Sequence, residues 1–594
     1  MNELDTLNVE LSGTNLIEAS AVTGKTYAIA CLYLRLLIEK GLTPDRILVV
    51  TFTEAATEEL RGRIRSRIRE ALHVFAGTAT DDPFLRALSA NTNGRGPGRD
   101  AAVDILNRAI SAFDTASIFT IHAFCLRALQ DNAFESGSLY DTELVTDPSR
   151  LVQETVDDFW RMKFFGDREP LLKAVLGEKC SPETFAAFAG KMLQNPKVKI
   201  LPDLGARDEA AVRRDCRESF EEVRKCWKER RAEIVHLLEN DTGLSRNEKT
   251  YRKDLLPPLF DGMDAFTGGD NPCDLFFGFG KFCTSGIIKG KKPTGTAPRH
   301  PFFDACERLK QLVEERLLLL KWELLEFCRE RLPLRKREAN IRFFSDLLND
   351  LHAALYGVSG DALARCLRDR YQAALIDEFQ DTDPVQYDIF HALFHRPETP
   401  LFLIGDPKQA IYSFRGADIF AYMEASRRVD RDRLFTLTSN WRSTPALLRA
   451  FNTLFDNGRK PFIFDEIPYH PISSGKPEPG TVLILKGNDG APLQVWTVPT
   501  GEGGKPLGVG TASDAVQVSV AAEIARLMGE GASGRACIEE RGNGRVTERP
   551  ITPGDIAVIV RSHRQAGLIQ EALRGAGIPS VMRSDETIFA TREA

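Results

Sequence analysis

The chain has 594 residues, and its 78 Lys and Arg against 84 Asp and Glu give a formal net charge of −6. Hydrophobic residues make up 43% and charged residues 27%, so a collagen-like or disordered composition is excluded. At ~100–200 residues per domain, the length predicts about three or four domains. Because the net charge of the chain is negative, a nucleic-acid partner would have to bind to a local positively charged patch of its surface.

The eleven cysteines are scattered, and no two of them form a C-x-x-C pair. This pattern favours reduced thiols in a cytoplasmic protein over a metal site or a disulfide framework. The first residues, MNELDTLNVELSG, lack the basic and apolar segments of a secretory signal. No run approaches ~20 uninterrupted apolar residues, so we expect no membrane partner.

Strand-like and helix-like segments alternate over residues 1–145, as in the apolar segment 46–53 followed by the helical pattern 54–75. This alternation predicts an α/β fold with a parallel sheet. Residues 146–340 instead contain long, charged amphipathic stretches, which predict a helical insertion. The α/β pattern resumes over 341–436, and 437–594 reads as a second α/β unit with an expected strand at DIAVIVRS, 555–562.

A phosphate-binding loop is predicted at residues 16–26, LIEASAVTGKT, where an apolar strand is followed by a small-residue turn and a helix. In such a loop the backbone N–H groups face the anion, Lys25 reaches the β- and γ-phosphate oxygens, and the Thr26 hydroxyl ligates Mg²⁺. Ala19 occupies the position of the first glycine in the common pattern. The Gly-Lys-Thr triplet alone does not exclude an ordinary strand, turn and helix.

Two adjacent acids follow the apolar strand in LIDEFQD, 375–381. Asp377 can hold Mg²⁺, and Glu378 can accept a proton from an attacking water. The alternative is a solvated acidic turn, which is less expected directly after so apolar a strand. Gln409 closes a second such strand in LIGDPKQ and could orient water at the γ-phosphate, although by itself it would be read as a polar loop residue.

Aromatic residues alternate in AIYSFRGAD, where Tyr412 and Phe414 would point the same way at strand spacing with Arg415 beside them. Such rings can stack on successive bases of a single strand. The alternative is that both rings fill a core. Five arginines on one predicted helix could track phosphates, but a solvated helix with intramolecular ion pairs is at least as consistent; they are Arg61, Arg63, Arg65, Arg67 and Arg69.

Six ordered segments together resemble the superfamily 1 helicases of the UvrD/Rep type. The sequences of these motifs most closely resemble those of the RecB-type motor, the beta subunit of bacterial exodeoxyribonuclease V. The segments are LIEASA-TGKT, VVTFTEAATEELRGRIRSRI, FTIHAFC, LIDEFQDTDPVQYDIF, LIGDPKQAIYSFRGAD and LTSNWRS. The resemblance runs from about residue 11 to 592. It implies two RecA-like motor domains with ATP and Mg²⁺ between them, a large helical insertion, and 3′ to 5′ movement on single-stranded DNA. It further implies duplex DNA ends and the gamma and alpha subunits of the complex as partners.

The resemblance also implies roles for single residues. Arg442 would reach the transferred phosphate and Trp441 would stack on adenine, while Glu378 and Gln409 would act in hydrolysis. The alternative for Trp441 is a core residue. The implied nucleotide-binding set is Ala19, Ser20, Ala21, Val22, Thr23, Gly24, Lys25, Thr26 and Trp441, with Thr26 and Asp377 on the metal. The implied DNA-binding set is Thr51, Phe52, Thr53, His122, Phe124, Tyr412, Phe414 and Arg415.

Three features depart from the family pattern. Val22 stands where the family has glycine, and Ser12 stands nearest to the expected adenine-reading glutamine. The segments for motifs V and VI and for the nuclease domain are not found, so we expect no DNA degradation and weak unwinding at most. The other function class that remains is a nucleotide- or DNA-binding scaffold that docks on partner subunits. A simple kinase-like enzyme fits less well, because it would not need the DNA-facing motifs.

Overall fold

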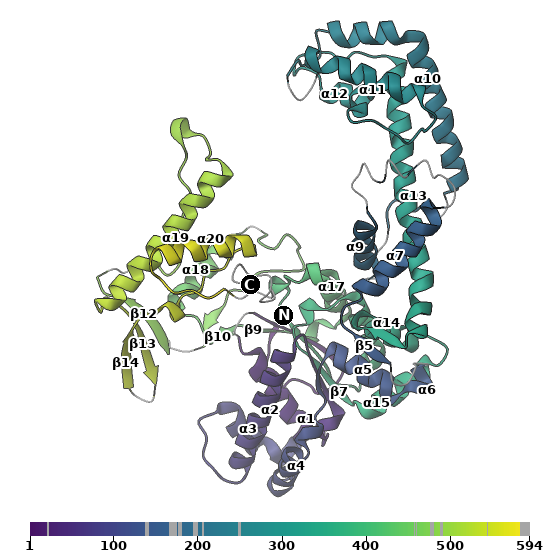
Figure 1. Cartoon of the computed structure of the whole chain (residues 1–594). Coiled ribbons are helices and arrows are strands. Elements are labelled where there is room, and N and C mark those ends of the chain that lie inside the picture. The colour runs from purple at the N-terminus through teal and green to yellow at the C-terminus, as the bar shows by residue number, and fades with distance from the viewer. Residues whose placement is uncertain are drawn as a thin grey trace. The chain divides into compact units, whose positions relative to one another are not determined.

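The computed structural model describes residues 1–20, 23–136, 142–165, 171, 175, 181–193, 200–204, 207–247, 251–456, 458, 460–475, 480–487, 491–542 and 545–582 (Figure 1). The chain forms two compact units. The first combines Met1–Phe124 with Asp361–Ala594, and the second is Cys125–Gly360. The first unit is therefore discontinuous in sequence, because the second is inserted into it.

A seven-stranded parallel sheet forms the centre of the first unit, which confirms the α/β fold class. Its strands, in spatial order, are β1 (Asn2–Glu3), β9 (Leu434–Leu437), β2 (Thr14–Ala19), β8 (Leu401–Gly405), β7 (Ala373–Ile376), β3 (Ile47–Thr51) and β4 (Ile118–Thr120). The central strands are continuous apolar runs because both faces of a parallel sheet are covered. In register, Ile17 of β2 lies opposite Ile404 of β8, and Leu403 of β8 opposite Ile376 of β7.

Helices connect these strands as crossovers. They are α1 (Lys25–Glu39), α2 (Glu54–Phe75), α3 (Pro83–Arg95), α4 (Arg99–Ser111), α5 (Ile121–Asp131), α15 (Gly360–Arg370), α16 (Pro384–Phe394) and α17 (Ile419–Arg428). Several begin at a side chain that caps the helix by accepting a backbone N–H bond, as Thr53 does for α2 and Asp383 for α16. Helices α1, α2 and α4 contact one another and share one buried core with β2 and β3.

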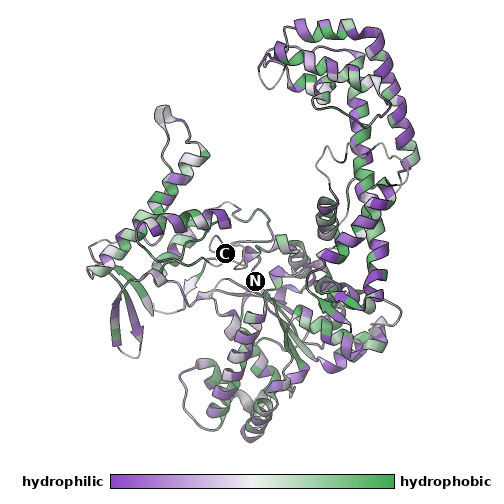
Figure 2. Cartoon of the chain, viewed as in Figure 1, coloured by the Kyte–Doolittle hydropathy of each residue, from purple (hydrophilic) through white to green (hydrophobic). Residues whose placement is uncertain are grey.

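The chain after β9 forms smaller elements. They are β10 (Ser439–Asn440), α18 (Pro445–Phe455), β11 (Ser473–Ser474), β12 (Thr481–Leu485), α19 (Val509–Ala532), β13 (Ala536–Gly542), β14 (Arg545–Pro550) and α20 (His563–Gly575). Strands β12, β13 and β14 pair antiparallel, and β14 is exposed along its length and drawn mainly as hydrophilic in Figure 2.

The strand expected at 555–562 is not formed, and that prediction is wrong for this structure. Among the described residues no neighbouring strand supplies ladder hydrogen bonds to the segment 556–560. Its apolar side chains instead line a hollow of about 850 Å³ next to α20, and Ile559 is almost fully exposed.

The second unit is mainly helical. Its elements are α6 (Ala133–Ser136), β5 (Glu143–Val145), α7 (Ser149–Phe164), α9 (Pro182–Leu193), α10 (Glu209–Asn240), α11 (Leu256–Gly268), α12 (Thr284–Lys289), α13 (Pro301–Glu338), β6 (Ile341–Phe343) and α14 (Phe344–Leu355). The long helices α10 and α13 pack along each other. The unit extends past the predicted limits of 146 and 340, because β5 pairs with β6 and α6 packs on α14.

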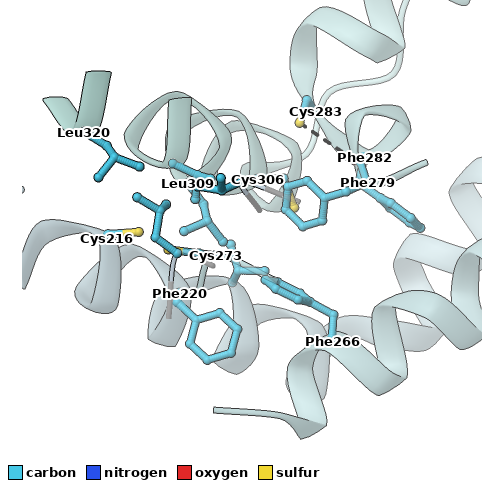
Figure 3. Close-up of a cluster of buried hydrophobic side chains, with 14 of the residues drawn as sticks. Cys216, Phe220, Phe266, Cys273, Phe279, Phe282, Cys283, Cys306, Leu309 and Leu320 are labelled. Atoms are coloured by element: carbon cyan, nitrogen blue, oxygen red, sulfur yellow. Dashed lines mark hydrogen bonds between the residues drawn. The ribbon is translucent and has the colours of Figure 1, made fainter. Parts of the chain in front are cut away.

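The core of this unit is rich in phenylalanine and cysteine. Figure 3 shows Phe266, Phe279 and Phe282 close to Cys283 and Cys306, all of them buried. Burial raises the pKa of the Cys283 thiol to about 12, so it stays a neutral packing residue. Among the described residues, ten cysteines carry no disulfide.

Candidate nucleotide-binding and DNA-facing site

The segment between β2 and α1 has the backbone of an anion-binding turn. Gly24 precedes α1 with φ +92°, a left-handed conformation that favours glycine. The Thr23 hydroxyl donates to the Ser20 carbonyl at 2.8 Å and closes the turn. No side chain caps α1 and no acid lies in its first turn, so its N–H groups and positive dipole end are available to a phosphate. Ala21 and Val22 lie outside the described residues, so the prediction for Val22 stays a prediction.

Lys25, which is predicted to bind phosphate, and Glu378, which is predicted to accept a proton, form an ion pair with each other. Lys25 Nζ lies 2.6 Å from Glu378 Oε2, and their side chains are 13% and 33% exposed. Glu378 has φ +49° and ψ +43°, which is rare for a residue other than glycine and is typical of strained functional positions. Gln380 Nε2 donates to the same oxygen at 2.7 Å. Each charge is therefore neutralised by the other.

Asp377 follows β7 in a half-buried position. Its backbone N–H donates to Val50 of β3 at 2.9 Å, and its Oδ1 accepts the Glu378 N–H at 2.9 Å. Burial and the nearby Glu378 carboxylate raise the pKa of Asp377 to about 6, although Lys25 lowers it. Burial and Glu378 likewise raise the pKa of Asp381 to about 6. The site therefore has an excess of negative charge that a cation would relieve.

Thr26 and Asp377 fit a nucleotide-bound Mg²⁺. Burial and Glu378 destabilise the Asp377 carboxyl as an anion. Thr26 is the second residue of α1, directly after Lys25. Within the described ranges, no group of three or more His, Cys, Asp or Glu side chains could enclose a metal. Mg²⁺ usually binds one or two protein groups together with substrate phosphates.

Gln409 lies at the end of the neighbouring strand β8. Its Nε2 donates to Asp406 Oδ2 at 2.6 Å, and the Asp406 N–H donates to Gln380 Oε1 at 2.8 Å. A Cβ on Gly405 would lie 2.6 Å from that Gln380 oxygen and 3.0 Å from the Gln380 backbone nitrogen, so glycine lets the end of β8 approach the turn that follows β7. The ends of the two strands are thus joined through the side chain of Gln380, which the sequence analysis had not singled out.

Two half-exposed aromatic rings lie beside the phosphate loop. A Cβ on Gly24 would lie 4.0 Å from Cδ1 of Trp441 and 3.9 Å from the Cβ of Tyr27. Trp441 is 52% exposed, so the alternative that it fills a core is wrong. Tyr27 is a residue that the sequence analysis missed, although its place directly after Thr26 was a usable signal. Arg442 is exposed, and its backbone N–H donates to Asn440 Oδ1 at 3.0 Å.

Three aromatic rings form a group that we name the aromatic row: Phe52, Tyr412 and Phe414. Phe52 and Tyr412 are stacked with ring centroids 5.2 Å apart, and Tyr412 and Phe414 lie 5.9 Å apart. Phe414 is 76% exposed, whereas a core residue would be buried. The expected strand spacing is wrong, because residues 413–415 form a short 3-10 turn. The Arg415 side chain lies outside the described part of the structure.

Other predicted DNA-facing residues have structural contacts instead. Thr51 is buried and its hydroxyl lies 2.5 Å from that of Thr57, while Thr53 caps α2. Phe124 has no exposed surface, because it packs against Tyr371 and Phe390 at centroid distances of 5.7 and 6.3 Å.

A side chain without exposed surface cannot stack on a base, so the DNA-facing prediction is wrong for Phe124 in this structure. Thr51 cannot offer its buried hydroxyl for the same reason. Burial lowers the pKa of His122, which therefore favours the neutral form. The DNA-facing role of His122 remains a prediction.

The arginines of α2 contact this chain itself. Arg61 donates to the Ile118 carbonyl at 3.0 Å, Arg63 pairs with Glu59, and Arg65 lies over the Phe113 ring. Arg67 pairs with Asp82 at 2.7 Å and lies over the Tyr27 ring at 4.7 Å. For Arg63 and Arg67, the alternative of intramolecular ion pairs is confirmed.

Comparison with known proteins identifies one family and several similar proteins. The pattern of the UvrD/REP helicase N-terminal domain family matches residues 2–430. The chain is 36% identical to the RecBCD enzyme subunit RecB of Escherichia coli (strain K12), over 100% of this chain and 50% of that protein. It is 32% identical to the subunit of the same name from Haemophilus influenzae, over 98% of this chain and 50% of that protein. With the RecB subunit of Mycobacterium tuberculosis (strain H37Rv) it shares 28% identity, over 98% of this chain and 41% of that protein.

The predicted resemblance to RecB-type helicases is confirmed by these matches. The chain spans about half the length of the curated relatives it matches. In the part of the chain that the structure describes, no helix is both long and apolar enough to cross a membrane.

Proposed function

Because the chain belongs to the UvrD/REP helicase N-terminal domain family, we propose that it is the motor portion of a recombinational-repair helicase, which hydrolyses ATP with Mg²⁺ to move 3′ to 5′ along single-stranded DNA. The observation that carries this proposal is the Lys25–Glu378 contact, which brings the end of the phosphate loop to the acid that follows β7. These residues come from the two separate sequence segments of the first unit. The fold thus brings the predicted phosphate-binding lysine within bonding distance of the predicted base.

In the proposed reaction, the loop N–H groups and Lys25 bind the phosphate oxygens of ATP. Thr26 and Asp377 would hold Mg²⁺, which would supply positive charge next to the β- and γ-phosphates. The arriving phosphate takes Lys25 away from Glu378, and the freed carboxylate accepts a proton from the attacking water. Gln409 orients that water.

Two further residues would contact the transferred phosphoryl group and the adenine base of ATP. Arg442 would stabilise the transferred phosphoryl group, since a guanidinium pairs well with phosphate oxygens. Trp441 would stack on adenine, and its exposure beside Gly24 supports this role.

We further propose that the aromatic row stacks on bases of the single strand. Its exposed end, Phe414, follows Gln409 by only five residues, so a change at the nucleotide can be transmitted to the DNA contact over a short segment. The relatives are named as subunits of the RecBCD enzyme. By analogy, the proposed partners are duplex DNA ends and the gamma and alpha subunits of such a complex.

The test is ATP hydrolysis by the purified chain with and without single-stranded DNA. We expect DNA to stimulate hydrolysis in the wild type and Glu378→Gln to abolish it. Nucleotide and DNA binding without any hydrolysis would instead support the scaffold alternative.

A further inference from the structure

A buried cluster of three charged side chains lies beside Gln409 and has no role in the reaction above. Glu18 comes from β2 and is 1% exposed, whereas Lys408 and Asp406 come from the turn after β8 and are 8% and 3% exposed. Lys408 Nζ is bonded to Glu18 Oε1 and lies 2.9 Å from Asp406 Oδ1. One ammonium therefore joins two carboxylates that come from adjacent strands.

Asp406 connects this cluster to Gln409. Its Oδ2 accepts the hydrogen bond from Gln409 Nε2 at 2.6 Å, while its Oδ1 is held by the ammonium and the backbone N–H of Lys408. Because different partners hold the two oxygens, the carboxylate cannot rotate without losing one of them. The direction of the Gln409 amide therefore depends on Lys408.

The cluster is costly to bury, which argues against a purely stabilising role. Buried ion pairs are often no more stable than apolar residues of similar volume, because both charges lose their water. Burial lowers the pKa of Lys408, but Glu18 and Asp406 raise it more, so the group stays charged. Glu18 Oε2 has no hydrogen-bond partner among the described residues. A charged cluster that costs this much free energy to bury lies at the ends of two strands that form the site. This placement favours a role in fixing the positions of the site's side chains.

We propose that Lys408 and Glu18 are positioning residues for the γ-phosphate sensor: they fix Asp406, and through it the Gln409 amide, against the strand that leads into the phosphate loop. This inference rests on the proposed role of Gln409. Glu18 directly precedes Ala19, where the loop begins, so the cluster ties the sensor to the loop across the β2–β8 contact.

The charges of the cluster predict an unequal response to substitution. Lys408→Met leaves two buried carboxylates without a cation, whereas Glu18→Gln leaves the Lys408–Asp406 pair in place. We therefore expect a large effect from Lys408→Met and a small one from Glu18→Gln. Adding Glu18→Gln to Lys408→Met should recover part of the loss, because it removes one of the two unpaired charges. Simple loss of packing would make the double variant worse than either single one.

The experiment is titration of the full 594-residue chain with fluorescent ATPγS and fluorescent ADP. Only ATPγS carries the γ-phosphate that Gln409 would sense. We expect Lys408→Met to reduce the preference for ATPγS by about tenfold and to leave ADP affinity unchanged, as Gln409→Ala should also do. In the Gln409→Ala background, Lys408→Met should add less than about threefold, because the two act in series. Lys460→Met, which removes an exposed ammonium far along the chain from this cluster, is the matched control.

Equal losses of ATPγS and ADP affinity in Lys408→Met would overturn the proposal in favour of a structural role. Additive effects of Lys408→Met and Gln409→Ala would show that Lys408 does not act through Gln409. If Gln409→Ala changes nothing while the wild type prefers ATPγS, the sensor role itself fails and this inference with it. If Lys408→Met does not fold, Glu18→Gln carries the same test, with an expected loss of about two- to fivefold.

Discussion

Replacing Glu378 by glutamine should tighten ATP binding even as it stops hydrolysis. Glu378 Oε2 lies 2.6 Å from Lys25 Nζ, so a phosphate that binds this lysine must displace the carboxylate. The pair is partly buried, at 13% and 33% exposure, and its net strength should lie between that of exposed pairs and that of buried ones, at about 1–2 kcal/mol. Since ~1.4 kcal/mol is tenfold in affinity, Glu378→Gln should lower the Kd for ATP by about 5- to 30-fold.

The other half of this experiment is Lys25→Ala, which should abolish detectable binding, because it removes the cation that meets the β- and γ-phosphates. A base acts only in the chemical step, whereas a phosphate-binding lysine acts in the ground state. Both variants are titrated with a fluorescent ATP analogue, and hydrolysis is measured in parallel. Glu58→Gln removes an exposed carboxylate of α2 and serves as the charge-matched control. An unchanged or higher Kd in Glu378→Gln would refute the competition between Glu378 and ATP for Lys25.

Three further outcomes are expected. Tyr412→Ala combined with Phe414→Ala should weaken single-stranded DNA binding by ~2–6 kcal/mol in a fluorescence anisotropy assay and leave ATP affinity unchanged; general unfolding would show that the rings are core. The contribution of Mg²⁺ to nucleotide affinity should fall as the pH drops through about 6. The pKa of Asp377 is raised to about 6, so below that pH its carboxyl is protonated and no longer a metal ligand. An Mg²⁺ contribution that persists well below this pH would contradict the assignment. Phe124→Ala should lower the free energy of unfolding by ~3–5 kcal/mol in denaturant titrations without a selective loss of DNA affinity, since the ring is part of the core; selective loss of DNA binding would restore its DNA-facing role.

The fold class could be predicted from sequence, and candidate site residues could be proposed from it, because their signals are local. A parallel strand buried on both faces is a short apolar run, and the polar residues that follow such runs meet at one edge of the sheet. Lys25, Asp377 and Gln409 each come directly after, or one turn after, a strand of this kind. Their residue types and spacing then suffice to indicate phosphate, metal and sensor roles.

Local patterns could not decide which of the aromatic and hydroxyl residues are exposed. The sequence analysis assigned Phe124 and Phe414 the same DNA-facing role, yet Phe124 is fully buried between Tyr371 and Phe390 and Phe414 is exposed. The segment 556–560 reads as a strand, but a strand needs a neighbour to accept its hydrogen bonds, and the described residues provide none.

The parallel α/β fold, the predicted phosphate loop and the acid pair after β7 can all be read from local patterns in the sequence. The bonds from Lys25 to Glu378 and from Lys408 to Glu18 cannot, because they span 353 and 390 residues of chain. These contacts follow from the spatial strand order β2, β8, β7, which brings three strand ends together. Strand order results from the packing of the whole sheet with its crossover helices, so no single segment of the sequence specifies it.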